Sequence, residues 1–450
     1  MSEPSPTDQT EVASRSLLER ALGLVSEVRS GEGATASILT INVFALLTAY
    51  YLIKPVRDAL IVSMPSGPEY KSYMGAVIAV LLVPAVALYS RVADRVPKHQ
   101  LVIGVTSFFA ANLLLFFGAS QIDAFEPKLG LVFYAWVGVF NMMAVAQFWA
   151  FANDVYEEDA GRRLFPVIGV GASLGAVTGA GLASGLNDLF GSPYPLLVVS
   201  ALILLLCAYF TFAVYRREGA RMARRTGSVP SAQKDTSGAF ALVLRHRYLL
   251  LIGLFSLVFT IVNSNGEYLL GRLARDALAA ETTSDAELKQ ALGGFYSDFY
   301  FYVNLAGVLL QTFAVSRIVK YLGFGSAFYI FPAVALVDAL AILFLPLFSI
   351  ARWGKTAENA VDYSLNNTLR NMLWLPTSED MKYKAKQAVD TVFVRLGDVS
   401  SGGLVWVGSA LVPLGAASFA GINAALVSVW LVLAVLIVKE RKRLLELEVQ

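Results

Sequence analysis

Charged residues set inside long apolar segments are the first feature of this 450-residue sequence that could do chemistry. A charge inside a hydrophobic helix costs about 2.5–3.5 kcal/mol on insertion scales and usually marks a functional path. One spacing of two cations and an acid occurs twice, as Lys54, Arg57 and Asp58 and again as Arg272, Arg275 and Asp276. Two copies of one costly element predict a protein built from two similar halves around a cation-lined centre, as in membrane transporters.

The spacing of these cations suits the binding of a phosphorylated anion. Cations three residues apart on a helix share one face, and the planar guanidinium of Arg matches phosphate oxygens. Arg370 and Arg395, which also lie within expected helices, could extend the same set. The aromatic side chains available to stack on a nucleobase are Tyr50, Tyr268, Phe148 and Trp149.

Two structural interpretations of the cations stay open beside this one. Each cation could pair with a nearby acid, Asp58 or Asp276, and so join helices rather than bind a substrate. Lys54 and Arg57 could instead extend their charged ends to the outer membrane surface. The recurrence of the pattern on a side where cations are otherwise scarce disfavours this second interpretation. Asp390 is a further candidate charge partner.

Glu267 is an acid that only the second copy carries, since Ala49 stands at the matching place in the first. A carboxyl group buried in an apolar helix can take up and release a proton near neutral pH. Glu267 could therefore couple transport to protons. The alternative is a salt bridge to Arg272, which follows it within about two helical turns.

The composition places these residues in a membrane. Hydrophobic residues make up 56% of the chain and charged residues 16%, against about 25% charged in ordinary globular domains. Roughly 20 apolar residues span the hydrocarbon core as a helix. We expect an all-α membrane protein with twelve such helices, near residues 37–63, 72–90, 101–119, 130–152, 164–187, 193–215, 248–270, 295–316, 323–350, 353–376, 388–412 and 418–438.

The expected spans fall into two pseudo-symmetric six-helix halves. The expected parts are a cytoplasmic N-terminal tail with a short amphipathic helix (1–35), an N-terminal half (36–215), a basic cytoplasmic linker (216–247), a C-terminal half (248–438) and a cytoplasmic tail (439–450). The polar start of the chain predicts no cleavable signal peptide. Because a basic linker near anionic lipid is typical of membrane proteins, we expect no nucleic-acid partner.

The distribution of cations predicts the orientation. The chain has 36 Lys and Arg residues, and most of them fall in the tails and the even-numbered loops. The odd-numbered loops are expected to hold only Lys71, Lys128, Lys289, Arg352 and Lys355. By the positive-inside rule, both termini are expected in the cytoplasm. Asp94 and Arg95 lie in the expected inner loop between spans two and three, and resemble the gating loop of the major facilitator superfamily.

The sequence favours neither an enzyme nor a cofactor or metal site. Gly169, Gly171 and Gly175 could be mistaken for a dinucleotide fingerprint, but the strand that this fingerprint needs is missing. With Gly179 they indicate instead a small-residue face that lets two membrane helices approach closely. The two histidines lie in expected loops, and a single cysteine excludes a cysteine ligand cluster.

Further residues in both halves complete a recognisable pattern. In the first half they are Lys54, Arg57 and Asp58, then Phe148, Trp149, Phe151, Ala152 and Asn153, then Arg163, Pro166 and Gly169. In the second half they are Tyr363, Ser364, Leu365, Arg370, Met372, Pro376, Lys384, Lys386, Asp390, Arg395, Leu396 and Gly397. Together they resemble the nucleotide transporter family, the ATP:ADP antiporters of intracellular bacteria and plastids. This chain departs from the family pattern at several positions. Lys54 and Arg57 stand where the family has Arg and Lys, so the two cation types are exchanged. Asp154 stands where Gln is expected, and Asp398 stands where Lys is expected.

The resemblance implies a major-facilitator-like carrier that moves nucleotides (ATP/ADP-like) or related phosphorylated anions by alternating access, through exchange or proton coupling. It implies substrate contact at Asn153 and gating at Arg163, Lys384 and Lys386. We expect a monomer in the lipid bilayer of a bacterial inner membrane. The alternatives are a proton-coupled carrier of another organic anion and a non-transporting membrane scaffold or sensor of the same fold.

Overall fold

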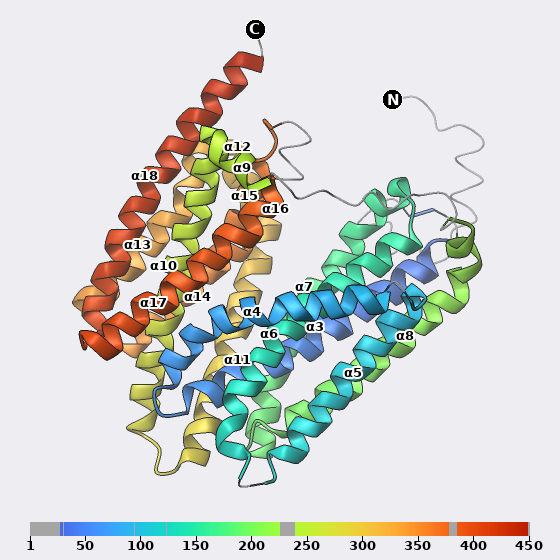
Figure 1. The fold of residues 1–450 in the computed structure, drawn as a ribbon, viewed down its shortest axis with the longest axis horizontal. Coiled ribbons are helices and arrows are strands. Elements are labelled where there is room, and N and C mark those ends of the chain that lie inside the picture. The colour runs from blue at the N-terminus through green and yellow to red at the C-terminus, as the bar shows by residue number, and fades with distance from the viewer. Residues whose placement is uncertain are drawn as a thin grey trace. The chain divides into compact units, whose positions relative to one another are not determined.

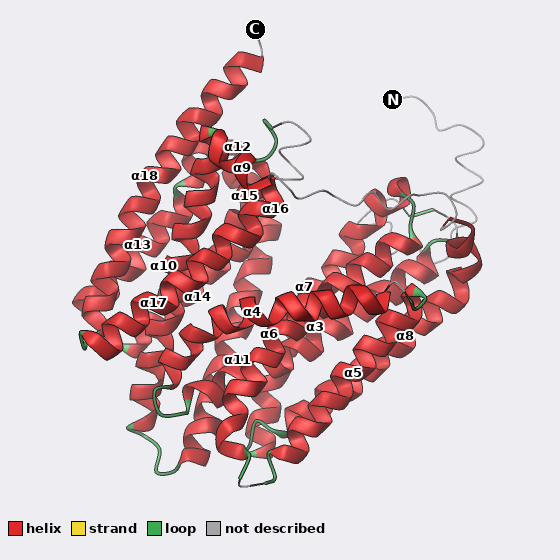
Figure 2. Ribbon diagram, viewed as in Figure 1, coloured by secondary structure: helices red, strands yellow, loops and turns green. Residues whose placement is uncertain are grey.

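The computed structural model describes residues 28–29, 31–93, 95–122, 124–225, 239–377 and 385–448. Most of the expected N-terminal amphipathic helix lies outside the described residues, as do two gating candidates, Asp94 and Lys384. Within the described part of the chain, every regular element is a helix, as Figure 2 shows. The predicted all-α class is therefore confirmed.

The helices follow the apolar segments of the sequence. In chain order they are α3 (Gly33–Val62), α4 (Gly67–Ala93), α5 (Lys98–Ala119), α6 (Glu126–Val155), α7 (Glu158–Phe190), α8 (Pro195–Arg225), α9 (Ala239–Arg245), α10 (Arg247–Ala279), α11 (Asp285–Leu309), α12 (Val315–Phe328), α13 (Ile330–Phe344), α14 (Phe348–Val361), α15 (Asn367–Met372), α16 (Lys386–Ala388), α17 (Val394–Trp406) and α18 (Ala416–Glu448). Wider π-helical turns interrupt the later helices at η1 (Leu310–Ala314), η2 (Asp362–Asn366), η4 (Val389–Phe393) and η5 (Val407–Leu411).

Nine helical segments of the described chain are long and apolar enough to cross a membrane. The shorter α13 and the two interrupted segments from α14 to α15 and from α16 to η5 make the predicted count of twelve compatible with the structure. The predicted ninth span, 323–350, is wrong at both ends. The chain leaves helical geometry at Gly323, where φ is 72° and ψ is 168°, and again around Pro346, which cannot continue a helix.

Backbone contacts divide the chain into two compact units, which Figure 1 shows as ribbons. Unit 1 comprises Met1–Val56, Val83–Leu129 and Trp136–Ser231, and unit 2 comprises Arg57–Leu82, Gly130–Ala135 and Ala232–Gln450. The chain passes from one unit to the other within α3, α4 and α6. The predicted halves differ in that they assign each of these three helices wholly to the N-terminal half.

In unit 1, α7 packs closely against α3 through its glycines. A Cβ added at Gly175 would clash with the carbonyl group of Phe44, and one at Gly179 would clash with that of Thr48. Gly171 meets the backbone of α3 in the same way one turn earlier. The predicted small-residue face is confirmed, because only glycine lets the two backbones come this near.

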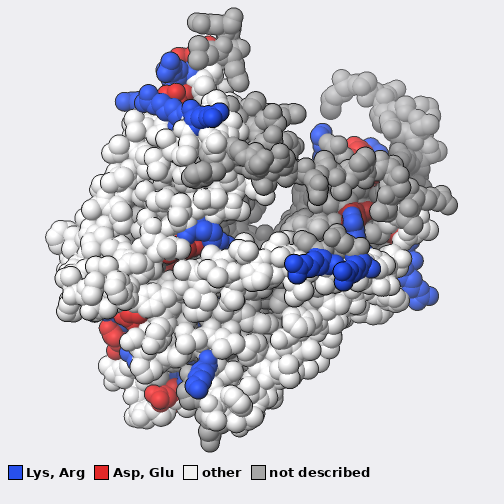
Figure 3. Space-filling view, in the orientation of Figure 1, with Lys and Arg blue, Asp and Glu red and all other residues white. Residues whose placement is uncertain are grey.

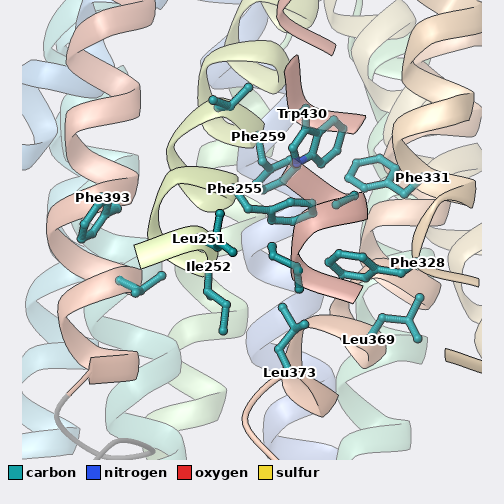
Figure 4. Packing of buried hydrophobic residues seen from close by; sticks show 14 of the residues in the cluster. Leu251, Ile252, Phe255, Phe259, Phe328, Phe331, Leu369, Leu373, Phe393 and Trp430 are labelled. Carbon is teal, nitrogen blue, oxygen red and sulfur yellow. The ribbon is translucent and has the colours of Figure 1, made fainter. Parts of the chain in front are cut away.

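In unit 2, an aromatic cluster joins α10, α12, α13 and α18. Figure 4 shows Phe255, Phe259, Phe328, Phe331 and Trp430 pointing toward one another from these helices. The rings of Phe255 and Phe328 are stacked with centroids 4.9 Å apart, and those of Phe331 and Trp430 meet edge to face at 5.0 Å. Such packing keeps the helices of this unit in fixed positions.

The charges on the surface of unit 2 are unevenly placed. The C-terminal end of α18 carries exposed basic side chains, among them Lys442 and Arg443. Figure 3 shows blue side chains gathered toward this end of the unit. The adjoining helices of this unit show a mostly uncharged surface in the same view. An apolar band beside a basic helix end is typical of a membrane protein.

Candidate functional site

The buried charges of unit 2 begin at Asp58 near the end of α3, whose side chain is 0% exposed. It accepts hydrogen bonds from Arg57 at 3.0 Å and from the hydroxyl of Tyr300 at 2.6 Å. The ammonium nitrogen of Lys71 lies 3.4 Å from its other oxygen. The guanidinium of Arg57 also lies 4.4 Å from the ring centroid of Tyr134. One acid thus pairs with two cations.

Lys71 reaches Asp58 because α4 begins directly after α3 ends. The chain turns at Ser66, whose φ of 55° is unusual for a residue with a side chain. At Gly67 an added Cβ would clash with the carbonyl oxygen of Ile61, so a glycine is needed for the tight turn. Lys71 then lies in the second turn of α4, close to the end of α3.

Lys71 also joins α4 to α10 and α14. Its Nζ lies 3.2 Å from Oε2 of Glu267, and the other oxygen of Glu267 accepts a hydrogen bond from Asn359 at 3.1 Å. The ring centroid of Tyr296 lies 4.9 Å from the same ammonium group. The side chain of Lys71 is 7% exposed and that of Glu267 is 20% exposed.

Lys355 on α14 is a second buried lysine, with its side chain 1% exposed. Its Nζ donates to Glu358 at 3.0 Å and to the side-chain oxygen of Asn263 on α10 at 2.8 Å. An added Cβ on Gly266 would lie 2.9 Å from this nitrogen. The glycine therefore leaves the space in which the ammonium group packs against α10.

Asp338 on α13 lies beside this lysine–glutamate pair and is also buried. A Cβ added at Gly354 would clash with its carboxyl group, so a glycine again makes room for a charged side chain. We refer to the buried ionic residues of unit 2 as the charged network: Arg57, Asp58, Lys71, Glu267, Asp338, Lys355 and Glu358.

The charged network places cations in a dry, fixed setting. Each cation is held by at least one carboxylate, and removing one partner of a buried pair typically costs about 3–5 kcal/mol. A phosphate oxygen offers a cation the same interaction that a carboxylate oxygen does. Chemically, the network can therefore exchange an internal carboxylate for an anionic ligand without leaving a buried cation uncompensated.

The two lysines of this network were not predicted as site residues. Lys71 and Lys355 were expected in outer loops, and this expectation is wrong, because both lie within helices and are buried. The signal that could have found them is the acid three residues after Lys355 and the lone acid, Asp338, within a strongly apolar segment. A buried Lys needs an anionic partner, so an acid in an apolar segment can indicate a buried lysine as well as a repeated cation can.

The first predicted copy is divided between the units. Lys54 belongs to unit 1, where its ammonium lies 5.1 Å from the ring centroid of Tyr51 and 5.8 Å from that of Tyr50. Tyr50 itself packs on Tyr51 and Phe140. Lys54 is 8% exposed in this setting, so snorkelling to solvent does not describe it.

The second copy has different partners from those expected. Arg272 donates to the carbonyl oxygen of Leu414 at 2.9 Å and to the hydroxyl of Tyr268 at 3.3 Å. The expected salt bridge between Glu267 and Arg272 is wrong, because Glu267 pairs with Lys71. Buried Tyr268 donates to Glu69 and packs on Phe419.

The remaining residues of the second copy lie nearer the surface. Arg275 is half-buried and Asp276 is exposed. No ion pair joins them among the described contacts. Asp58 and Asp276 occupy matching positions in the two copies, but Asp58 is buried and Asp276 is exposed.

Arg370 and Lys386 line a small pocket of about 210 Å³ in unit 2. Arg370 lies 3.5 Å from Asp390, and its guanidinium is 5.3 Å from the ring centroid of Phe259. Lys386 donates to Asn371 at 3.0 Å. The pocket thus brings together two cations and Asp390, for which the sequence predicted separate roles.

Arg395 pairs with Asp398, one turn later on α17, at 2.9 Å. A Cβ added at Gly75 of α4 would lie 3.3 Å from the side chain of Asp398. The departure from the family pattern at residue 398 therefore supplies an acid that compensates Arg395.

In unit 1, Asn153 lines a larger pocket of about 580 Å³ together with Arg162 and Phe165. Phe148 is buried, and Trp149 packs edge to face on Phe165 at 5.7 Å. Trp149 therefore contributes to the packing of α6 against α7, and Phe148 is buried beside it. Contact with a ligand stays a prediction for both residues.

Two further charge pairs tie the ends of helices in unit 1. Arg163 donates to both oxygens of Glu32 at 2.9 Å, and Asp154 accepts from Lys98 at 2.7 Å. Burial opposes ionisation of Glu32, but the hydrogen bonds and charge of Arg163 outweigh it and hold the pKa of Glu32 below its usual value. Arg95 is exposed.

No three His, Cys, Asp or Glu side chains of the described chain lie in a geometry that could hold a metal ion.

Comparison with known proteins identifies the chain's relatives. Residues 354–444 match the family model described as TLC ATP/ADP transporter. The chain is 21% identical to ADP,ATP carrier protein 1 of Chlamydia pneumoniae, over 87% of this chain and 88% of that protein. It is 22% identical to ADP,ATP carrier protein 1 of Chlamydia muridarum, over 81% of this chain and 80% of that protein. These findings confirm the resemblance stated from the sequence.

Solved structures confirm the fold. The nucleoside transporter NupG matches with a TM-score of 0.64 and 13% identity, covering 90% of this chain and 99% of that one. The peptide transporter POT matches with a TM-score of 0.63 and 12% identity, covering 96% and 100%. The predicted major-facilitator-like architecture is therefore confirmed.

Proposed function

We propose that this chain, which carries a TLC ATP/ADP transporter match and is similar to chlamydial ADP,ATP carriers, is a membrane transporter of nucleotides or related phosphorylated anions. It works by alternating access rather than by chemistry on its substrate. The structural observation that supports the proposal is the charged network, in which buried cations pair with carboxylates that an anion can replace.

In the proposed mechanism, substrate phosphates compete with internal carboxylates for the cations. Lys71 and Lys355 pair with Glu267 and Glu358 when no substrate is bound. A phosphate group that takes the place of a carboxylate keeps the lysine compensated, so a buried charge never stands alone. The empty carrier is stable for the same reason, because each lysine then returns to its own acid.

Among the residues selected from sequence, we assign Arg57 to phosphate binding first. It is 12% exposed and already paired with a carboxylate. The pocket beside Arg370 and Lys386 is a second place where an anion could be held. The other proposed contacts are Lys54, Arg272, Arg275 and Arg395, with Tyr50, Tyr268, Phe148, Trp149 and Asn153 as candidate contacts of the base.

The proposal includes a setting and a gate. The chain is assigned to a bacterial inner membrane as a monomer, with both termini in the cytoplasm, where the basic end of α18 would face anionic lipid. Arg95, Arg163 and Lys386 are assigned to gating on that side. Asp94 and Lys384, which complete the gating set, lie outside the described residues.

One observation favours a second candidate, a carrier of a less highly charged organic anion. Asp398 compensates Arg395, and Asp154 compensates Lys98. Each acid lowers the positive charge available at a position where the family pattern has no acid. Such a site would prefer a substrate with fewer negative charges than ATP.

Uptake into proteoliposomes tests the proposal directly. Purified protein is reconstituted with and without unlabelled ADP inside, and labelled ATP, ADP and AMP are offered outside. Saturable uptake of a nucleotide that internal nucleotide accelerates is the expected result. A different outcome would replace the first candidate by the second. In that outcome no nucleotide is taken up, another labelled organic anion is taken up, and nucleotides do not compete with it. Absence of transport for every anion would leave a non-transporting membrane protein.

A further inference from the structure

Asp338 is a buried acid that the proposed substrate site does not use. Its side chain lies on α13 and is 7% exposed, and its Oδ1 has no hydrogen-bond partner. A Cβ added at Gly354 would clash with this carboxyl group, which therefore faces the part of α14 that carries Glu358 one turn later. Ionised carboxylates only accept hydrogen bonds. Two such groups in contact leave a buried oxygen without a donor, and this arrangement is costly in an apolar interior.

The groups that face Asp338 do not supply the missing donor. Lys355 and Glu358 on α14 are the charged groups beside it, and Lys355 already donates to Glu358 and to Asn263. Glu267 of α10 lies beyond Lys355 and is held by Lys71 and Asn359.

The other helices packed against α13 bring no cation to Asp338 within the described part of the chain. Asp362 of η2 accepts from Asn366 at 2.6 Å. On α18, Trp430 packs on Phe331, two turns before Asp338 on α13. Since no described group donates to Oδ1 of Asp338, a proton on one of the two carboxyl groups would supply the missing donor.

The charges of the network lead to the same conclusion. Its cations are Arg57, Lys71 and Lys355, and its acids are Asp58, Glu267, Glu358 and Asp338. The acids exceed the cations by one. An uncompensated buried charge is strongly disfavoured, and one proton removes it.

We propose that Asp338 and Glu358 form a proton-binding site that couples anion transport to a proton gradient. The coupling rests on the proposed transport function, whereas the shared proton itself does not. The proton passes from water to a carboxylate oxygen and later returns to water, and no other bond forms or breaks. Lys355, which the proposed mechanism assigns to a substrate phosphate, forms an ion pair with Glu358 of this site.

The coupling follows from the position of Lys355 between the acid pair and Glu267. The empty carrier keeps one proton on Asp338, and Lys355 pairs with ionised Glu358. When Glu358 takes up a second proton, the hydrogen bond from Lys355 loses its charged partner, and the ammonium group attracts an anion more strongly. This second proton and the anion are then carried together. After both leave, Lys355 pairs again with ionised Glu358, and the proton on Asp338 keeps the network neutral.

Infrared spectroscopy of the purified, substrate-free protein tests the shared proton. Wild-type protein should show the carbonyl stretch of a protonated, buried carboxylic acid near neutral pH. Asp338→Asn and Glu358→Gln should each lose that band. The matched control is Asp298→Asn, which removes a partly exposed acid paired with Arg352 and should keep it. Absence of the band in wild type, or its persistence in both variants, would overturn the proposal.

Transport with an imposed pH gradient tests the coupling separately. Acid outside should accelerate anion uptake by wild type and by Asp298→Asn, and should have no effect on Asp338→Asn. If Asp338→Asn does not elute as a folded monodisperse protein, Glu358→Gln, whose side chain keeps its size, serves instead. A variant that still responds to the gradient rules the coupling out. If wild type moves no nucleotide under any condition, the proposed function fails, and the infrared band still decides the proton site.

Discussion

The two copies of the repeated charge pattern end in opposite environments. In the first copy, Asp58 is fully buried and pairs with Arg57 and Lys71. In the second, Asp276 is exposed, and Arg272 donates to a backbone carbonyl oxygen rather than to an acid. Equal spacing along a helix therefore indicates a common pattern, but the neighbouring helices decide what each charge does. Of the repeated charges, only Arg57 and Asp58 belong to the charged network, and the second copy contributes Glu267, which has no counterpart in the first.

The largest difference between the copies should appear in stability. Asp58→Ala removes the buried carboxylate that pairs with Arg57 and with Lys71, so that Lys71 keeps Glu267 alone, and should destabilise the protein by about 3–5 kcal/mol. Asp276→Ala alters an exposed side chain and should change stability by less than about 0.5 kcal/mol. Thermal unfolding of the detergent-solubilised variants measures both. Equal losses in the two variants would contradict the assignment of Asp58 alone to a buried network.

Ligand binding should separate the copies next. Arg57→Ala removes a cation of the network and should weaken ATP binding by about 2–5 kcal/mol, since it leaves a charged contact without its partner. Arg275→Ala should weaken binding less, because Arg275 is half-buried and outside the network. The dissociation constant for ATP, measured by microscale thermophoresis on both folded variants, provides the comparison. A larger loss in Arg275→Ala would reverse the ranking.

Close packing around the charged network should make stability sensitive to substitution of the glycine that faces Asp338. Gly354→Ala places a Cβ against the carboxyl group of Asp338, so that α13 and α14 must move apart. Overpacking of this kind typically costs about 1–3 kcal/mol. The control is Gly403→Ala in α17, where a Cβ would meet no atom within 4 Å. If both variants lower the melting temperature equally, close packing at Gly354 is not the cause.

The smallest expected effect concerns the pair of Glu32 and Arg163 in unit 1. The lowered pKa of Glu32 means that its stabilising contribution is present above its ordinary pKa and is lost as pH falls through the lowered value. Glu32→Gln should cost about 1 kcal/mol or less near neutral pH, because the pair is partly exposed.

The matched measurement for that pair is the acid limb of the stability curve. Wild type should lose more stability than Glu32→Gln between mildly and strongly acid pH. Parallel curves for the two proteins would show that the ion pair does not contribute.

Hydrophobicity was enough to predict the helices, because each apolar segment must satisfy its backbone inside the bilayer. It was also enough to predict the glycine face of α7, where Gly171, Gly175 and Gly179 recur every four residues. The errors lie at helix ends. Gly323 and Pro346 end helices that the hydropathy pattern would continue.

The site was only partly predictable. Arg57 and Asp58 could be selected because they stand in an apolar segment that repeats. Lys71 and Lys355 were missed because they lie near the polar ends of apolar segments, where a charge is usually solvated. Their partners, Glu267 and Asn263, come from a helix remote in sequence, and no spacing rule within one helix predicts such a contact.

Binding of ATP to Lys355→Gln tests the central claim, that buried cations of the network bind the substrate phosphates. Isothermal titration of the purified protein would compare it with Lys128→Gln, in which an exposed lysine is replaced. We expect Lys355→Gln to lose at least about 30-fold in affinity, the equivalent of about 2 kcal/mol, and Lys128→Gln to bind as wild type does. Unchanged affinity in a folded Lys355→Gln variant would contradict the claim.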